Sequence, residues 1–423
     1  MKASVDLLVT DAAEVVTVDG GGDGPLAGRA QDQAGVRAGA ALAIAGGRIV
    51  AVAPQADLLA RFDAPATLSA RGGTVLPGLV DAHTHPVFDG TREAEFDMRA
   101  RGAGYQQITA AGGGIFSSVR GLRAASRERL ASLLAGRLDR FLAAGTTTLE
   151  AKSGYGLSYE HELLSLELLA EADAGHPVDI AATCLAAHQM APEFKHDRDG
   201  YITEICERIL PEVARRGLAT SADVFCDEGA FSVDESRRVL EAARACGLRL
   251  RVHADELAPV GAAELAAACG ADTADHLVKI SDAGMAAMLA AGTMPVLLPA
   301  TCFSLRLDHT APARRMLESG LPVALATDFN PGTSYTFSMV DVISLACGLL
   351  GLTVAEAVVA ATRNAAASLA LPGVRGRLAP GALADLVVLD VPNHLFLGYQ
   401  VGGVRVRAVV KGGRLVAEDG RCV

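Results

Sequence analysis

His83 and His85, separated by a single residue, are the first sign of chemistry in this 423-residue chain. They follow an apolar run, residues 74–80, and stand beside Asp81. In an extended strand alternate side chains leave the same face, so both imidazoles can bind one metal ion. A catalytic zinc or iron ion takes about three or four protein ligands plus an open position for water. The pair is therefore either an accident of a strand end or part of a metal site whose other ligands lie elsewhere.

The elements that must position these residues alternate between short apolar runs and amphipathic helical stretches. Eight strand-like runs occupy residues 74–80, 146–150, 179–185, 222–226, 248–252, 272–274, 294–298 and 323–326. Eight such repeats predict an α/β fold, a (β/α)8 barrel. Thr353 and Glu356 form a capping-box pattern, which predicts a final helix running to about residue 371.

Both chain ends have a different pattern, because they contain short strand-like segments without helices between them. These segments are residues 6–10, 14–18, 41–44, 47–52, 384–390 and 404–416. They predict a small β-sandwich domain built from residues 1–73 plus 377–423, beside a barrel formed by residues 74–376. Residues 20–39 are rich in glycine and polar residues, and we expect them to form a mobile surface segment.

Polar residues with chemical potential recur where the strand-like runs end. They are His83 and His85, His188, His253 and Glu256, Asp275 and His276, and Asp328, which follow runs one, three, five, six and eight. In a barrel these ends meet at one mouth, where active sites of this fold are built. A hydrogen-bonded core position is the simpler interpretation of any one histidine. Agreement among five strand ends favours a shared site.

Three imidazoles and one carboxylate from these strand ends would form a ligand shell: His83, His85, His253 and Asp328. Such a shell suits one Zn²⁺ or one Fe²⁺ or Fe³⁺ per chain, and the ligand types do not choose between the metals. Two-metal barrel hydrolases commonly carry a bridging carboxylated lysine after strand four, where this chain has Asp227 and Glu228. One metal is therefore expected. Lys152, after the second run, is interpreted as a solvated or ion-paired side chain.

The chemistry that this shell suits is hydrolysis. A bound metal ion lowers the pKa of water from about 15.7 to near 7, which supplies a nucleophile at neutral pH. Asp328 is a candidate to accept the proton of that water, Glu256 to carry a proton to a leaving nitrogen, and His276 to polarise the attacked carbonyl. The three groups can titrate together, so the sequence does not assign each proton, and a rim salt bridge is the alternative for Glu256.

Longer motifs around these residues carry a family resemblance that covers nearly the whole chain. They occupy residues 77–88, 92–96, 111–115, 152–157, 223–226, 253–257 and 327–334. On these motifs the chain resembles the metal-dependent amidohydrolases, and within that family it is most similar to the imidazolonepropionases of histidine degradation. The resemblance implies a metal-bearing barrel with a β-sandwich, a homodimer, and hydrolysis of 4-imidazolone-5-propanoate to N-formimidoyl-L-glutamate.

The resemblance also implies which residues meet the substrate. Arg92, Tyr155, His188 and Glu256 would contact it, with Asn330, Gly332 and Thr333 lining the product side. These assignments make chemical sense, because a propionate needs a cation such as Arg92 and hydroxyls such as those of Tyr155 and Tyr105.

Each of these assignments has an alternative. Arg92 could instead pair with Glu93 or Glu95, and either tyrosine could be a core aromatic. The turn-forming residues 330–332 are expected to direct backbone amides towards the ligand. Gln189 and Tyr335 depart from the family pattern, which puts the shape of their loops in question.

Composition narrows the function classes. A formal net charge of −11 opposes binding to a phosphate backbone. No run of about 20 apolar residues is present, and the eight cysteines lack CxxC pairing, so we expect a soluble cytoplasmic enzyme with reduced thiols and no nucleic-acid or membrane partner. Two other functions stay open: a deaminase of the cytosine or guanine type with the same metal shell, and a non-catalytic amidohydrolase-like scaffold.

Overall fold

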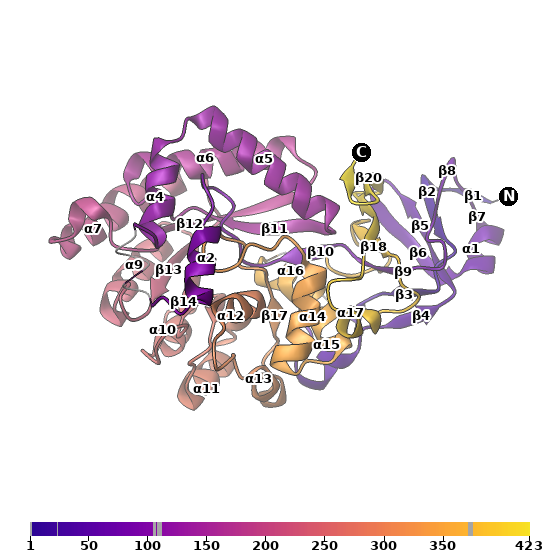
Figure 1. Ribbon diagram of the computed structural model, residues 1–423. Coiled ribbons are helices and arrows are strands. Elements are labelled where there is room, and N and C mark those ends of the chain that lie inside the picture. Colours follow the sequence, from indigo (N-terminus) through magenta and orange to yellow (C-terminus); the bar gives the residue numbers. More distant parts are fainter. Residues whose placement is uncertain (1, 23, 105–106, 108–111, 371–374) are drawn as a thin grey trace.

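The computed structural model describes residues 2–22, 24–104, 107, 112–370 and 375–423. A barrel surrounded by helices lies beside a smaller β-domain that contains both chain termini (Figure 1). Within the described ranges, no helix is long and apolar enough to cross a membrane.

The barrel sheet has eight parallel strands that pair in chain order. They are β10 (Leu79–Asp81), β11 (Thr146–Lys152), β12 (Asp179–Ala187), β13 (Ser221–Cys226), β14 (Arg249–Ala254), β15 (Thr273–His276), β16 (Met294–Leu297) and β17 (Ala324–Leu325). Backbone hydrogen bonds just beyond the first and last strands bring their ends together: Asp328 N donates to His83 O at 3.0 Å, and His85 N to Phe329 O at 2.8 Å. The predicted (β/α)8 barrel is confirmed.

Helices pack around this sheet, and most occupy the connections between its strands (Figure 1). They are α2 (Glu93–Ala100), α4 (Ile115–Ala124), α5 (Arg127–Ala143), α6 (Tyr159–Gly175), α7 (Arg198–Glu204), α8 (Leu210–Arg216), α9 (Val233–Ala245), α10 (Ala262–Ala268), α11 (Asp282–Ala291), α12 (Pro299–Leu305), α13 (Ala313–Ser319), α14 (Met339–Leu350), α15 (Val354–Val359) and α16 (Ala365–Ser368). The predicted capping box of Thr353 and Glu356 starts α15, and a π-helical turn joins α15 to α16. Side-chain caps of this kind satisfy amides that have no partner inside the helix.

The β-domain has two main sheets, and both chain ends contribute to it, as the sequence predicts. Its seven-stranded sheet runs in the order β21 (Arg421–Cys422), β20 (Arg414–Glu418), β19 (Val406–Lys411), β18 (Leu386–Leu389), β9 (Thr74–Pro77), β3 (Glu14–Val16) and β4 (Val36–Ala38). The four-stranded sheet runs β6 (Arg48–Pro54), β5 (Ala40–Ala45), β2 (Leu7–Thr10) and β8 (Ala66–Ser69). Alternate apolar side chains of both sheets, such as Leu42 and Val388, form one buried cluster.

Four shorter elements complete the β-domain. A two-stranded pair is formed by β1 (Ala3–Ser4) and β7 (Phe62–Asp63), and α1 (Gln55–Arg61) precedes β7. Near the other chain end, α17 (Phe396–Tyr399) packs against α14.

The run at residues 74–80, expected to be the first barrel strand, is divided between the two domains. Strand β9 pairs with β18 and β3 of the β-domain, and only β10 belongs to the barrel. Gly78 separates them, and a Cβ there would lie 2.3 Å from Oγ1 of Thr147, so only glycine allows this close approach. The expectation that residues 74–80 form a single barrel strand is wrong. The domain boundary expected between residues 73 and 74 stays a prediction.

Residues 20–39 contain a short 3-10 helix, Gly28–Asp32, that packs against α13 and α15 of the barrel. Gln31 is fully buried, and its side-chain amide donates to the carbonyls of Val323 and Glu356. The expectation of a mobile surface segment is wrong for this part, because a polar side chain can be buried when its hydrogen bonds are made by backbone groups.

Candidate metal centre and active site

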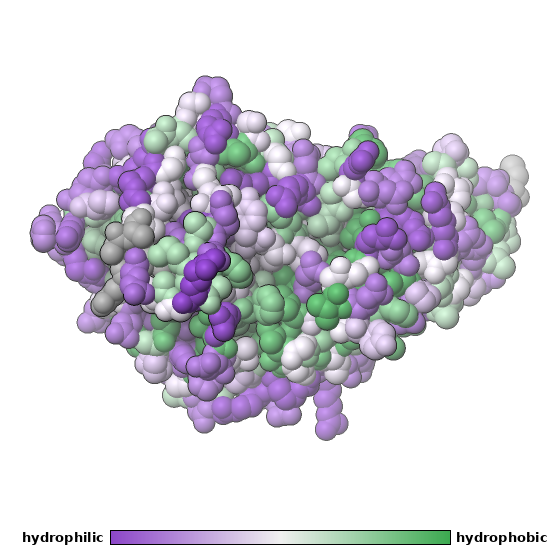
Figure 2. Space-filling model, in the orientation of Figure 1, coloured by the Kyte–Doolittle hydropathy of each residue, from purple (hydrophilic) through white to green (hydrophobic). Residues whose placement is uncertain are grey.

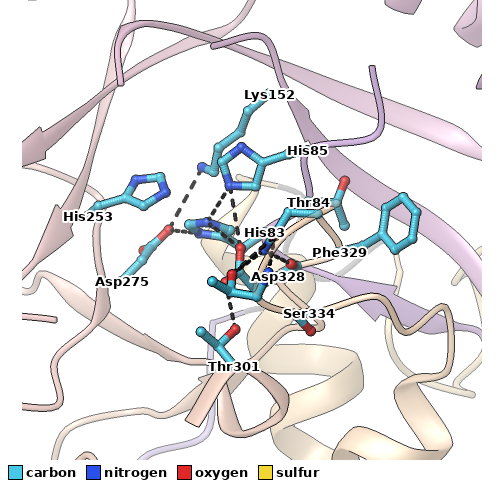
Figure 3. A network of polar contacts seen from close by, with 12 residues as sticks. His83, Thr84, His85, Lys152, His253, Asp275, Thr301, Asp328, Phe329 and Ser334 are labelled. Carbon is cyan, nitrogen blue, oxygen red and sulfur yellow. Dashed lines mark hydrogen bonds and ion pairs between the residues drawn. The ribbon is translucent and has the colours of Figure 1, made fainter. Parts of the chain in front are cut away.

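The structure brings the predicted residues at the strand ends into one buried cluster. His83, His85, His253 and Asp328 lie near one another, with Lys152 and Asp275 adjacent (Figure 3). Backbone hydrogen bonds between residues 83–85 and 328–329 join the first and last strands of the barrel. The same bonds place His83 and His85 next to Asp328. Barrel closure therefore brings together three of the four proposed ligands, and His253 of β14 is the fourth.

The spacing of the donor atoms fits a single ion. Nε2 of His83 lies 3.2 Å from Nε2 of His85, and Oδ1 of Asp328 lies 3.6 Å and 3.4 Å from these two atoms. Two ligands of a tetrahedral ion, each about 2.1 Å from it, are separated by about 3.4 Å. Possible donor atoms of His83, His85 and His253 all lie within 4.8 Å of one another, as do those of His83, His276 and Asp328.

The protonation state of the imidazoles also suits a metal. Burial, followed by the positive charge of Lys152, holds the pKa of His83 well below its usual value. Burial likewise lowers the pKa of His85, and it lowers that of His276 to about 3. Among the described residues, Nε2 of His253 and of His276 have no hydrogen-bond partner. Buried nitrogens without a partner are costly unless a ligand satisfies them, and a metal ion is one that does.

Buried carboxylates lie behind two of these imidazoles, hydrogen-bonded to His83 and at ion-pair distance from His253. Nδ1 of His83 donates to Oδ2 of Asp275 at 2.6 Å, which leaves its Nε2 lone pair facing the cluster. Oδ2 of Asp223 lies 3.0 Å from Nδ1 of His253. Carboxylates behind metal-ligating histidines fix the tautomer and the ring orientation. Asp223 begins the motif at residues 223–226, but the sequence assigns it no role; its position inside a strand with apolar neighbours is the signal of a buried charge.

Asp328 is fixed from a further direction. Oγ1 of Thr301, in α12, donates to Oδ2 of Asp328 at 2.6 Å, so Oδ1 is the oxygen left near the histidines. Asp328 and His276 have backbone φ angles of +52° and +74°, a region that L-residues seldom adopt. Nothing in the sequence singled out Thr301, because it lies in a helix beyond strand seven.

Glu256 and His276 form a second pair at the edge of the cluster. Nδ1 of His276 lies 3.6 Å from Oε1 of Glu256. Oδ2 of Asp227 accepts the backbone amides of Glu256 and Leu257, which holds this turn in place. Burial, with added repulsion from Asp328 and Asp227, raises the pKa of Glu256 well above its usual value. Glu256 therefore keeps its proton to a higher pH than an ordinary glutamate.

His188 and Tyr155 lie on the other side of His85. Nδ1 of His188 donates to Gly154 O at 2.9 Å, so its Nε2 carries a lone pair. The ring of His188 stacks on the ring of His85, and their centroids are 5.2 Å apart. The centroid of the Tyr155 ring lies 5.4 Å from that of His188. Burial raises the pKa of Tyr155, which keeps its hydroxyl protonated as a hydrogen-bond donor.

Arg92 pairs with Glu95, which was the alternative raised by the sequence. Its Nε donates to Oε1 at 3.0 Å and its Nη2 to Oε2 at 2.8 Å. Its Nη1 faces Gly332, where a Cβ would lie only 2.2 Å from that nitrogen. A pocket of about 450 Å³ opens between α2 and the 331–336 loop, and Arg92, Thr333 and Tyr335 are among its lining residues.

The turn at residues 330–333 is shaped by its own asparagine. Oδ1 of Asn330 accepts the amides of Gly332 and Thr333 at 2.8 and 2.7 Å. The expectation that these amides turn towards a ligand is wrong in this structure, because the asparagine carbonyl takes them in an Asx turn. Tyr105, expected to donate a hydroxyl, lies outside the described residues.

Comparison with known proteins places this arrangement in a family. The amidohydrolase family profile matches residues 74–416. An imidazolonepropionase from Geobacillus kaustophilus is 47% identical over 419 residues, which cover 98% of this chain and 99% of that one. An imidazolonepropionase from Symbiobacterium thermophilum is 46% identical over 421 residues, covering 99% and 98%. The chain belongs to the amidohydrolase family, among the imidazolonepropionases.

Solved structures agree on the fold. The crystal structure of an adenosine deaminase from Xanthomonas campestris with bound zinc superposes with a TM-score of 0.69 at 18% identity, covering 100% of this chain and 95% of that one. At this identity the likeness shows the fold alone.

Membership in the family confirms the predicted enzyme class, a hydrolase that acts on a cyclic amide. Together with the grouped histidines, it supports a divalent metal in this amidohydrolase. Neither alternative is favoured: full-length relatives carry the name imidazolonepropionase, and all four proposed ligands are present in the cluster.

Proposed function

We propose that this amidohydrolase hydrolyses the cyclic amide bond of 4-imidazolone-5-propanoate to give N-formimidoyl-L-glutamate, a step of L-histidine degradation. Water adds to the ring carbonyl carbon, the carbon–nitrogen bond breaks, and a proton passes to the departing nitrogen. The observation that carries this proposal is identity of 46–47% to imidazolonepropionases over nearly the full length of both chains.

In the proposed site the metal is held by four residues: His83, His85, His253 and Asp328. The donor separations of 3.2–3.6 Å among His83, His85 and Asp328 support this set, as does the unpartnered Nε2 of His253. We propose Zn²⁺ or an iron ion, because imidazole and carboxylate ligands accept both. When bound, such an ion supplies Lewis acidity and lowers the pKa of water towards 7.

The protein's own groups move the protons. Asp328 accepts the proton of the attacking water through Oδ1, while Thr301 holds its other oxygen. Glu256 donates the proton to the ring nitrogen, a role that suits a carboxyl group whose pKa is raised by burial. His276, next to Glu256, polarises the carbonyl that is attacked.

The remaining proposed residues bind and orient the substrate. Arg92 attracts the propionate through Nη1, the nitrogen that Glu95 does not take. His188 accepts a ring N–H at Nε2, and Tyr155 donates its hydroxyl. Tyr105 contributes a second hydroxyl, and Asn330, Gly332 and Thr333 shape the wall on the product side. A closed, mostly buried site of this kind strengthens each of these polar contacts.

The proposal extends to the state of the enzyme in the cell. We propose a cytoplasmic homodimer that binds a small molecule and has no nucleic-acid partner. An apolar area supports the dimer: Phe303 of α12, Leu349 of α14 and Leu395 are 61%, 40% and 57% exposed. Figure 2 shows hydrophobic residues gathered over the region of α12 and α14.

One assay tests the proposed reaction. Synthetic 4-imidazolone-5-propanoate is added to enzyme loaded with Zn²⁺ or Fe²⁺, and loss of the ring absorbance is followed beside a chelated control. We expect turnover that disappears on chelation and returns when metal is restored. Metal-loaded enzyme that leaves this substrate intact but deaminates cytosine or guanine would overturn the proposal, and protein that binds no metal would support a scaffold.

A further inference from the structure

Five charged side chains are buried together beneath the histidines. They are Glu150, Lys152, Asp223, Arg251 and Asp275. The side chains of Lys152, Asp223 and Asp275 have no exposed area. Burying an ion costs several kcal/mol, and well-packed apolar side chains are often as stabilising as a buried ion pair. Stability alone therefore gives no reason for this cluster.

Lys152 lies at the centre of the buried charges. Its Nζ donates to Oδ2 of Asp223 at 2.7 Å and to Oε1 of Glu150 at 2.8 Å. Oδ2 of Asp275 lies 3.9 Å away, as the dashed line from Lys152 in Figure 3 marks. Burial lowers the pKa of Lys152, but Asp223 and Glu150 outweigh that effect and raise it above its usual value, so the ammonium is charged.

The two aspartates near Lys152 are the ones that contact imidazoles of the metal centre. Asp223 lies beside Nδ1 of His253, and its Oδ1 also accepts the His253 backbone amide. Asp275 accepts from Nδ1 of His83 through the same Oδ2 that faces Lys152. One ammonium thus lies behind two carboxylate–histidine pairs that come from three different strands, β13, β14 and β15, and from the segment after β10.

We propose that Lys152 is a positioning residue for the metal centre, which fixes Asp223 and Asp275 and, through them, the aim of His253 and His83 at one ion. Without the ammonium, Asp275 keeps its hydrogen bond from Nη2 of Arg251 at 3.3 Å, but the two aspartates lose the charge between them and move apart, and both imidazoles turn with them. The proposal rests on the ligand set given under the proposed function, since it needs His83 and His253 to bind the metal.

The test measures metal affinity, a readout that a purely structural lysine would not change. In Lys152→Met the chain keeps its bulk and loses its charge. We expect Zn²⁺ affinity, measured on apo-protein by competition with a chromophoric chelator, to fall about 10–100-fold, as is usual when a partner of a metal ligand is lost. The visible spectrum of bound Co²⁺ should change as well, because it reports coordination geometry.

The chain supplies a matched control in Lys411. Its Nζ also joins two carboxylates, Asp179 and Asp385, but these belong to the contact between the barrel and the β-domain and are not bonded to an imidazole. Lys411→Met should keep the wild-type Zn²⁺ affinity and Co²⁺ spectrum. Equal losses of affinity in the two variants would mean that general destabilisation explains both, and would overturn the proposal.

Two further variants decide the matter if Lys152→Met does not fold. Asp223→Asn and Asp275→Asn keep the shape of the side chain, and each should lower Zn²⁺ affinity about 10-fold or more. Where Lys152→Met folds, the double variant with Asp275→Asn should lose less than the product of the single losses, because the two residues act together. Additive losses, or wild-type affinity in either asparagine variant, would reject the inference.

His253→Ala separates failure of the inference from failure of the proposed site. If this variant binds Zn²⁺ as tightly as the wild type, the proposed ligand set is wrong. If it loses Zn²⁺ while Lys152→Met binds normally, the ligand set stands and only the role of Lys152 is rejected.

Discussion

The two ends of the barrel each contain a lysine that joins two carboxylates, and the surroundings of the two lysines differ. Lys152 is the last residue of β11, and its partner Asp223 contacts a histidine. Lys411 meets Asp179, the first residue of β12, and Asp385 of the β-domain. The side chain of Lys152 is fully buried, whereas Asp179 is 36% exposed.

The same ionic arrangement therefore serves two purposes in one molecule. At the carboxyl ends of the strands it lies against the groups proposed to do chemistry, and at the amino end it connects two domains. In barrels of this kind, substitutions of carboxyl-end residues that contact the candidate active site are expected to change activity, whereas substitutions elsewhere, including the amino end, are expected to change stability. The following substitutions test that division.

The largest effect is expected at Asp328. Asp328→Asn keeps the hydrogen bond from Thr301 within reach but cannot accept the proton of water. We expect kcat/KM to fall about 10²–10⁴-fold, the usual contribution of a general base, with little change in the free energy of unfolding of the apo-protein. Steady-state kinetics and urea unfolding measure the two quantities. If Asp328→Asn instead showed a large loss of stability and normal kinetics, the proposed difference between the two ends of the barrel would be contradicted.

A smaller effect on activity is expected at Arg92. Arg92→Ala removes the proposed cation for the propionate and should cost about 2–3 kcal/mol in kcat/KM, mainly by raising KM. The matched control is Arg101→Ala, which removes an exposed pair with Asp97 just beyond the same helix, α2. Unchanged kinetics in Arg92→Ala would remove this arginine from the site and leave Glu95 as its only partner.

At the opposite end, Lys411→Met should act on stability. It leaves the carboxylates of Asp179 and Asp385 with less counter-charge, and Asp385 is only 3% exposed. Because the site is partly solvated and Arg375 stays beside both carboxylates, we expect a loss of about 2–3 kcal/mol in the free energy of unfolding, less than for a fully buried pair. kcat/KM should match the wild type at temperatures where both proteins are folded. A tenfold loss of kcat/KM would contradict the comparison.

The smallest effect concerns Glu235, which lies near the carboxyl end of β13 but outside the metal cluster. The hydrogen bonds from Arg198 and then from Ser232, outweighing partial burial, lower its pKa to about 2. A lowered pKa in the folded state stabilises the protein above the unfolded pKa of about 4.3, and this contribution is lost as pH falls from there towards 2.

Solvent screening limits this contribution of Glu235 to about 1 kcal/mol. Urea unfolding of the wild type and of Glu235→Gln, compared at pH 7 and pH 3, isolates it as a difference between the two proteins. Activity at pH 7 should be the same in both. We expect a residue near the carboxyl ends of the strands to affect catalysis only if it contacts the candidate active site. A lower kcat/KM in Glu235→Gln would contradict this expectation.

Much of the fold follows from local pattern. Alternation of apolar runs with amphipathic stretches indicates eight strand–helix repeats, and the capping box at Thr353 and Glu356 appears where the sequence predicts it. The division of residues 74–80 between two sheets could not be predicted from local sequence pattern. Both halves are apolar, and only the contact of Gly78 with Thr147 in the folded chain separates them.

By itself the sequence determined the residue types of the proposed site, because His83, His85, His253 and Asp328 follow strand-like runs whose carboxyl ends must meet in a barrel. Only the tertiary structure decided their partners. That Asp275 bonds His83, that Thr301 holds Asp328 and that Lys152 lies behind two aspartates depends on which strands and helices become neighbours. Hydrogen bonds and ion pairs act over a few ångströms, and barrel closure brings residues far apart in the chain within that distance.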